Sequence, residues 1–246
     1  MISELLLLSK NDIPFIEAQV NIHQPTINEI SFISEESFHI GCQLLTFSKS
    51  LLSPKDKSNL ENMSDFEIFM SIMNDVENSF EERDRAIQVL MLLFPLYEIK
   101  VFKDKISFFQ DNNEVSSINE RNFLAFQEIV KQMFDMEGSL EEEQQQAYNP
   151  ADALAAKIAE KLKKRTDKLA KQSEIKKIAI FSRYISILAV GERKDINDLM
   201  QYSVYQLKDE IKRYKLKDRF DMFVKAKMAG AQDLEEVEDW MKDIHP

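Results

Sequence analysis

Glycine is scarce in this sequence, with four residues among 246, and there are six prolines and a single cysteine, Cys42. So few glycines disfavour glycine-rich phosphate loops and β architectures built on tight turns. One cysteine rules out an intrachain disulfide and any metal site that needs several thiolates. The composition therefore favours an α-rich fold in which Cys42 is a small buried hydrophobic residue.

Long apolar runs are also missing. No stretch approaches the ~20 apolar residues of a membrane-spanning helix, and the opening MISELLLLSK lacks the basic start of a signal peptide. We therefore expect no membrane association and a cytoplasmic location. The sequence contains no phosphate loop, nucleophile elbow, dinucleotide fingerprint or HExxH motif. We expect no enzymatic activity and no cofactor.

The histidines His23, His39 and His245 have no metal-ligand neighbours at helical spacing. His39 and Cys42 are three residues apart and could share a helix face. A half-buried helix surface explains that pair better than a metal or thiol site, because no further ligands accompany it. We therefore expect no metal site and no catalytic residues.

Charge is unevenly distributed along the chain. Residues 1–150 contain 11 Lys/Arg and 26 Asp/Glu, a net charge of −15. Residues 151–230 contain 20 and 11, a net charge of +9, and residues 231–246 contain 1 and 6, a net charge of −5. The acidic and basic regions could contact each other within one chain or between two copies, or they could simply be solvated helix faces.

The N-terminal region, 1–136, reads as α+β. Thr26 with Glu29, and Ser64 with Glu67, have capping-box spacing and predict helix starts. The segment 14–25 fits a short edge strand with Ala18, Val20 and Ile22 on one side. A nearly all-apolar helix is predicted to end at Pro95, and a β-hairpin to turn at Lys103-Asp104. A polar patch, 111–117, should lead into a helix capped by Asn119.

An acidic, Gln-rich stretch, 137–150, is the predicted flexible linker. The following region, 151–230, is predicted to be a basic, all-α domain, and 231–246 an acidic amphipathic tail. The fold class expected is mainly α, with an α+β N-terminal region containing a small β-hairpin and an all-α C-terminal region. Limited proteolysis should then cut first between Glu141 and Tyr148.

Within the C-terminal region, Phe181, Ile185 and Leu188 share a helix face, and Gly191 suits a left-handed cap after them. Asp195 and Ser203 can cap two further helices. In the last helix the apolar stripe moves to roughly the opposite side after Tyr214. The sequence therefore predicts either a bend near Lys215 or one long helix packed on both sides.

Several phrases of the sequence resemble a known family. They are SRYISILAVGERKDINDLMQYSVYQLKDEIKRYKLKDRFDMFVKAKMAGA, VEDWMKDIH, NPADALAAKIAEKLKKR and IHQPTINEI. Together they resemble the tail assembly chaperones and related baseplate assembly proteins of tailed bacteriophages. The resemblance implies a non-enzymatic chaperone that binds apolar helical segments of a phage tail protein, such as the tape measure or baseplate hub. It also implies a location in the host cytoplasm or in the virion.

Two apolar stripes are the candidate protein-binding residues. They are Leu216, Phe220, Phe223 and Met228 in the last helix, and Leu234, Val237, Trp240, Met241 and Ile244 in the tail. A tail this short is too brief to be stable as an isolated helix, so it should order only when it docks, with Trp240 as anchor. Its groove could lie on the basic 151–230 region of its own chain or on a partner, and self-association is a further alternative.

Two other functions compete with the chaperone. One is a structural tail or baseplate component that stays in the particle. The other is a nucleic-acid-binding accessory protein that uses the basic helix 157–171. The acidic total charge of −11 and the few aromatic residues among those lysines disfavour nucleic acid.

Overall fold

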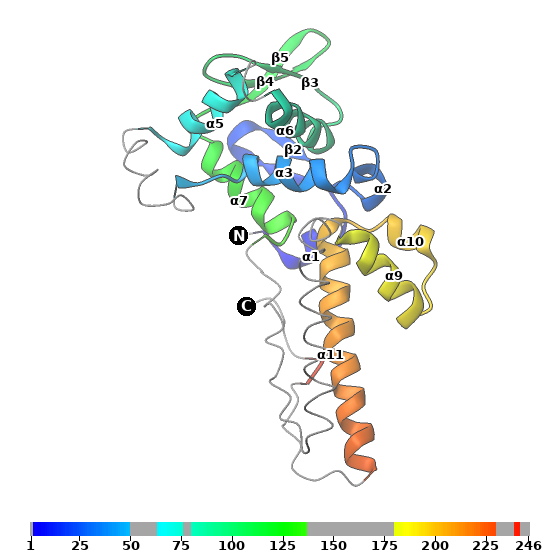
Figure 1. Ribbon diagram of the computed structural model, residues 1–246. Helices are drawn as coiled ribbons and strands as arrows, with labels where there is room; N and C mark the ends of the chain where they lie inside the picture. Colours follow the sequence, from blue (N-terminus) through cyan, green and yellow to red (C-terminus); the bar gives the residue numbers. More distant parts are fainter. Residues whose placement is uncertain (1, 50–62, 76–79, 137–179, 230–238, 242–246) are drawn as a thin grey trace.

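The computed structural model describes residues 2–49, 63–75, 80–136, 180–229 and 239–241. Figure 1 shows an N-terminal body of helices and two small sheets, and one long C-terminal helix that extends away from it. Both sheets are antiparallel and belong to the N-terminal region, whereas residues 180–229 contain only helices and their connections. The predicted fold class is therefore confirmed.

The N-terminal body is built from short helices and strands. In chain order they are α1 (Glu4–Leu8), β1 (Ile13–Phe15), a 3-10 turn (Ile16–Ala18), β2 (Val20–Ile22), α2 (Ile27–Ile30), α3 (Glu35–Leu45), α5 (Asp65–Asn74), α6 (Phe80–Leu93), β3 (Glu98–Val101), β4 (Ile106–Gln110), β5 (Asn113–Ile118) and α7 (Phe123–Met133).

Both predicted capping boxes are present. At the start of α2, the Glu29 amide donates to the Thr26 hydroxyl at 3.2 Å, and the Thr26 amide donates to the Glu29 carboxylate at 2.7 Å. Ser64 and Glu67 make the same pair of bonds at the start of α5. Each box satisfies two amides that a helix start leaves without an intrahelical acceptor.

The segment predicted as one edge strand is instead a hairpin. Strands β1 and β2 pair with Ile13 opposite Ile22, and the chain reverses through the 3-10 turn and Gln19, whose φ is 56°. Val20 and Ile22 are buried as expected, but Ala18 lies in the turn rather than the strand. The prediction was wrong because the apolar residues before Gln19 belong to the partner strand.

The hairpin predicted around Lys103-Asp104 is present as β3 and β4, but it has a third strand. The stretch 111–117, predicted to be a polar patch, contains most of β5, which pairs antiparallel with β4. Asp111 and Asn112 both have positive φ, 51° and 64°, as a two-residue hairpin turn requires. Polar side chains hide this strand in the sequence, since only Ile118 of β5 is buried.

Helix α7 lies at the centre of the aromatic core. It begins at Phe123 rather than after Asn119, because the Asn122 side chain accepts the Asn119 amide at 2.8 Å and donates to the Ser117 carbonyl at 2.9 Å. Phe123 and Phe126 are buried, and Phe123 stacks on Phe69 at a ring separation of 5.1 Å. Phe66 of α5 and Phe94, just after α6, thus pack against rings of this helix, and Phe108 of β4 packs on Phe94.

The C-terminal helices are α9 (Phe181–Gly191), α10 (Ile196–Met200) and α11 (Val204–Met228). Asp195 caps α10 by accepting the Asn197 amide at 2.7 Å, and Ser203 begins α11 with a capping box closed by Gln206, so both predicted starts are confirmed. Helix α11 continues past Lys215 to Met228 without a break, so it is one long helix, but the packing on both sides that the sequence predicts is not seen, since no residue beyond Ile211 is buried.

Gly191 does not act as a left-handed cap. It is the last residue of α9, and positive φ occurs two residues later, at Arg193. A Cβ at position 191 would lie 2.5 Å from Cζ and 2.7 Å from Cε2 of Tyr214 in α11. Any other residue here would have to displace the end of the Tyr214 ring, which occupies the space of a side chain.

Hydrogen bonds attach the C-terminal helices to the N-terminal body. The N-caps of α2 and α11 pair as an antiparallel bridge, Thr26 with Ser203, and the Ile27 amide donates to the Tyr202 carbonyl at 2.9 Å. Lys208 donates to the carbonyls of Phe134 and Asp135 at 2.8 and 3.1 Å at the end of α7. One hydrophobic core contains residues from both regions, and the predicted linker, 137–150, lies outside the described residues.

Candidate protein-interaction surfaces

The first part of helix α11 packs into the hydrophobic core, and the rest of the helix does not. Its buried residues, Val204, Tyr205, Leu207 and Ile211, all lie in the first eight positions. Figure 1 shows the remainder extending away from the N-terminal body as a single rod. Beyond Ile211 no residue of this helix is buried, and its apolar side chains there are either half-buried or exposed.

The predicted residues of α11 form a stripe on that outer half. At roughly 100° per residue, Leu216, Phe220 and Phe223 fall within one narrow sector, about opposite the buried Leu207. All three are half-buried, and Lys227 lies over the Phe223 ring at 5.4 Å. Met228 is 83% exposed and lies about 120° round the helix from Leu216, so it is not part of the stripe.

The predicted tail residues are described only in part. Leu234, Val237 and Ile244 lie outside the described residues. Trp240 is half-buried and Met241 is 69% exposed, and the Arg213 guanidinium of α11 donates to the Trp240 carbonyl at 3.3 Å. The structure thus places one residue of the tail stripe, Trp240, against helix α11 of the same chain.

A second apolar surface was missed by the sequence analysis. It is a groove of about 500 Å³ between the α2–α3 segment and helices α9 and α10. Its lining consists of apolar residues and serines, namely Ile27, Ser31, Ser34, Phe181, Ser182, Ile185, Ser186, Ala189, Val190, Ile196 and Met200, together with Glu35. Two segments about 150 residues apart form it, so no local pattern could reveal it.

Glu35 holds one wall of the groove against the other. Its carboxylate accepts the amide of Phe181 at 2.6 Å and also that of Ile180, at the N-terminus of α9. Burial raises the pKa of Glu35, and the amides that it accepts only partly offset that effect. A negative charge at a helix N-terminus is favourable, so Glu35 positions α9. Val190 and Ile196, 80% and 56% exposed, leave the rim apolar.

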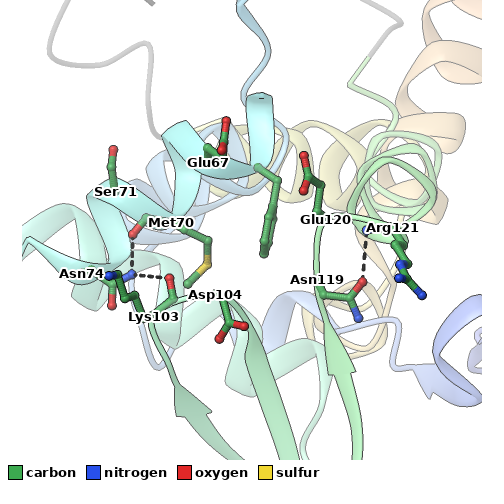
Figure 2. Close-up of a pocket in the computed structure, with 10 residues that line it drawn as sticks. Glu67, Met70, Ser71, Asn74, Lys103, Asp104, Asn119, Glu120 and Arg121 are labelled. Atoms are coloured by element: carbon green, nitrogen blue, oxygen red, sulfur yellow. Dashed lines mark hydrogen bonds between the residues drawn. The ribbon is translucent and has the colours of Figure 1, made fainter. Parts of the chain in front are cut away.

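A third depression, of about 730 Å³, lies between α5, the β3–β4 turn and the start of α7 (Figure 2). Asn74 spans its floor by donating to the carbonyls of Met70 and Lys103 at 2.8 and 3.2 Å. Acidic and basic side chains are mixed along its edge, and Ser71 donates its hydroxyl proton to the Ile68 carbonyl. The Ser71 hydroxyl is therefore already hydrogen-bonded to the backbone. Because acidic and basic side chains are mixed around the depression, its charge does not indicate a ligand of either sign.

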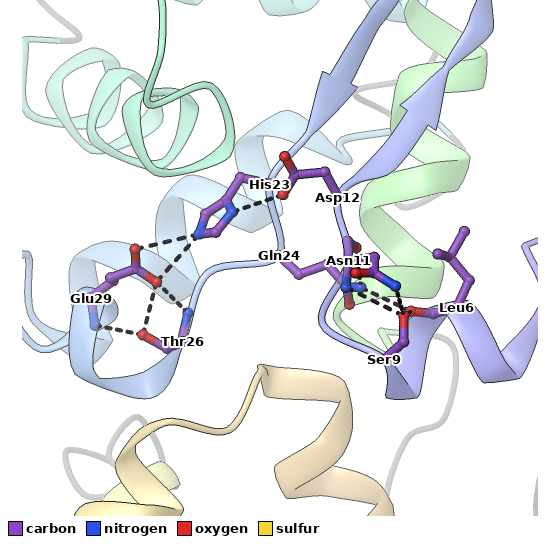
Figure 3. Close-up of polar contacts among 8 residues, drawn as sticks. All are labelled: Leu6, Ser9, Asn11, Asp12, His23, Gln24, Thr26 and Glu29. Carbon is purple, nitrogen blue, oxygen red and sulfur yellow. Dashed lines mark hydrogen bonds and ion pairs between the residues drawn. The ribbon is translucent and has the colours of Figure 1, made fainter.

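His23 stands between two carboxylates (Figure 3). Its Nδ1 lies 3.0 Å from Asp12, and its Nε2 lies 3.3 Å from Glu29. Because the two carboxylates meet opposite sides of the ring, they cannot bind one ion together. Burial raises the pKa of Glu29, but Thr26 and His23 outweigh it and the net shift is downward. The cluster braces the capping box of α2.

Gln24, next to His23, ties the same region to α1. It is 1% exposed, and its amide group donates to the carbonyls of Leu6 and Asn11 at 3.1 and 2.8 Å. These contacts hold Gln24 against α1, and the bridge between Thr26 and Ser203 places the same phrase, IHQPTINEI, beside the start of α11.

In α3, His39 is half-buried and Cys42 is buried. Cys42 is 3% exposed, and burial raises the pKa of its thiol far above the ordinary value. Burial lowers the pKa of His39, whose ring lies 6.3 Å from that of Phe181. Among the described residues, no group of three or more His, Cys, Asp or Glu side chains could hold a metal ion. In that same part of the chain, every helix is too short or too polar to cross a bilayer.

Residues 170–245 match the family model of the YomV second domain, a domain family linked to bacteriophages. The matched range contains α9, α10 and α11, and thus both the groove wall and the outer stripe. No curated protein and no solved structure matches the chain. The match agrees with the phage resemblance at the level of a phage-linked domain.

Proposed function

We propose that this protein is a non-enzymatic assembly factor of a tailed bacteriophage, which binds apolar helical segments of a tail protein while the tail is built. The tape measure and the baseplate hub are the partner classes that the sequence resemblance suggests. The single observation that carries the proposal is the apolar stripe Leu216, Phe220 and Phe223, presented on a helix beyond the folded body.

The stripe suits an amphipathic helix as its ligand. Its three side chains recur at steps of four and three residues, which is the spacing with which one helix lies along another. Lysine and arginine flank it on α11 and would exclude basic segments while tolerating acidic ones. The groove between α3 and α9 offers a second apolar contact, so one client chain could occupy both.

The test replaces Phe220 or Phe223 with serine and measures both folding and binding. Because neither ring is fully buried, we expect the circular dichroism of these variants to match the wild type. Pull-down of tail proteins from infected cells should fall at least tenfold. Met222→Ser is the matched control, since Met222 is 62% exposed on the other side of the same helix. Folded serine variants with full client binding would refute the proposal.

The stripe could also serve a component that remains in the particle. Mass spectrometry of purified particles separates the two, because an assembly factor leaves the finished tail and a structural component stays. Light scattering over a concentration series would show self-association through the stripe as a rise in mass. Phe220→Ser should abolish such a rise.

A further inference from the structure

We propose that the acidic C-terminal segment docks through Trp240 on the basic outer half of α11 in the same chain, and occupies the surface that a client would use. The direct observation is the contact between Arg213 and Trp240. The Arg213 guanidinium donates to the Trp240 carbonyl at 3.3 Å, and the Trp240 side chain is half-buried.

Charge favours this docking. From Lys212 to Met228, α11 contains seven Lys/Arg and two Asp, a net charge of +5. Residues 231–246 carry a net charge of −5. Opposite charges on two facing segments attract without any specific pairing, and the attraction is stronger at low salt. A basic segment of the same length would be repelled.

Chain geometry favours docking within one molecule. Arg213 and Met228 are fifteen residues apart on one helix, a rise of roughly 22 Å at 1.5 Å per residue. The twelve residues from Met228 to Trp240 can span up to about 40 Å when extended. The tail can therefore return along α11 and reach Arg213 without strain. In this arrangement the Trp240 backbone lies beside the helix that bears the stripe.

The sequence of the tail then indicates which kind of partner can bind to α11. Its sequence combines an apolar stripe that contains one aromatic residue, Trp240, with acids on most other positions. A client that replaces it should have the same chemistry, namely an acidic amphipathic helix with an aromatic anchor. This statement about the client rests on the proposed function, whereas docking of the tail does not.

The experiment uses the fluorescence of the full chain. Trp240 is the only tryptophan, so acrylamide quenching of its emission reports its exposure alone. In the wild type we expect quenching at least threefold weaker than for free tryptophan and independent of protein concentration. Arg213→Glu, or the milder Arg213→Ala, should raise the quenching constant at least twofold, and 1 M NaCl should do the same in the wild type. Arg121→Glu, an equal charge change on an exposed residue at the start of α7, should leave it unchanged.

Three outcomes would overturn docking in cis. The first is wild-type quenching equal to that of free tryptophan, the second is equal quenching in both Arg213 variants, and the third is protection that appears only as concentration rises. Competition is tested separately with Trp240→Ala, which should bind tail proteins at least threefold more tightly. Protected Trp240 with no client binding by any variant would sink the proposed function and leave the docking intact.

Discussion

Replacing Gly191 with alanine should destabilise the C-terminal helices because of one neighbour, Tyr214. The added methyl group would lie 2.5 Å from Cζ of the tyrosine ring, where no real Cβ contact occurs. Overpacking a filled site costs about 1–3 kcal/mol. Alanine regains about 0.5–1 kcal/mol over glycine within a helix. We expect a net loss of about 0.5–2 kcal/mol in the free energy of unfolding.

The assay is a double-mutant cycle on chemical denaturation. Tyr214→Leu removes the ring, so Gly191→Ala in that background should cost nothing or stabilise the protein slightly. The coupling between the two changes should be about 1 kcal/mol or more, as for other contacting pairs. A left-handed cap would behave differently, since its cost comes from the backbone of residue 191 alone. An equal cost of Gly191→Ala with and without the tyrosine would refute the packing explanation.

Three further predictions test other contacts. Lys208→Met removes two charge-assisted hydrogen bonds to carbonyls at the end of α7, including that of Phe134. In chemical denaturation it should lower the free energy of unfolding by about 2–4 kcal/mol. The control, Lys217→Met on the exposed side of α11, should lower it by less than about 0.5 kcal/mol. The folded pKa of Glu35 is raised above its ordinary value of 4.5, so the folded state holds this proton more tightly and stability falls as pH rises from 4.5 through the folded pKa. Glu35→Gln should remove that part of the pH dependence, and an unchanged profile would contradict it. Cys42 should react with a thiol reagent only at the rate of unfolding, because the thiol is buried and its pKa is raised; fast labelling of the native protein would count against its burial.

Local sequence signals located several of the helix starts, those of α2, α5, α10 and α11. Capping boxes depend on residues three apart, so Thr26 with Glu29 and Ser203 with Gln206 could be recognised without any tertiary information. The β3–β4 hairpin was recognisable for the same reason, from alternation in a short segment. The α-rich class followed from composition, and these predictions hold because their physical causes lie within a few residues of chain.

Other features depended on residues far apart in the sequence. Strand β5 has polar side chains, and only its pairing with β4 makes it a strand. Gly191 looks like a cap until Tyr214 is seen beside it. The apolar stripe of α11 was predicted, but only the tertiary structure shows that Leu207 is buried in the core while Phe220 lies in the half of the helix that has no buried residue.

The sequence by itself determined the α-rich class, the helix starts, the charge contrast between regions and the apolar stripe that includes Phe220. The groove between α3 and α9, the contact of Arg213 with Trp240, and the bridge of Thr26 with Ser203 came only from the tertiary structure. The physical reason is the range of the interactions. Capping and periodicity act within one or two helical turns. The groove, the contact and the bridge each join segments far apart in the chain, so no local sequence pattern indicates them.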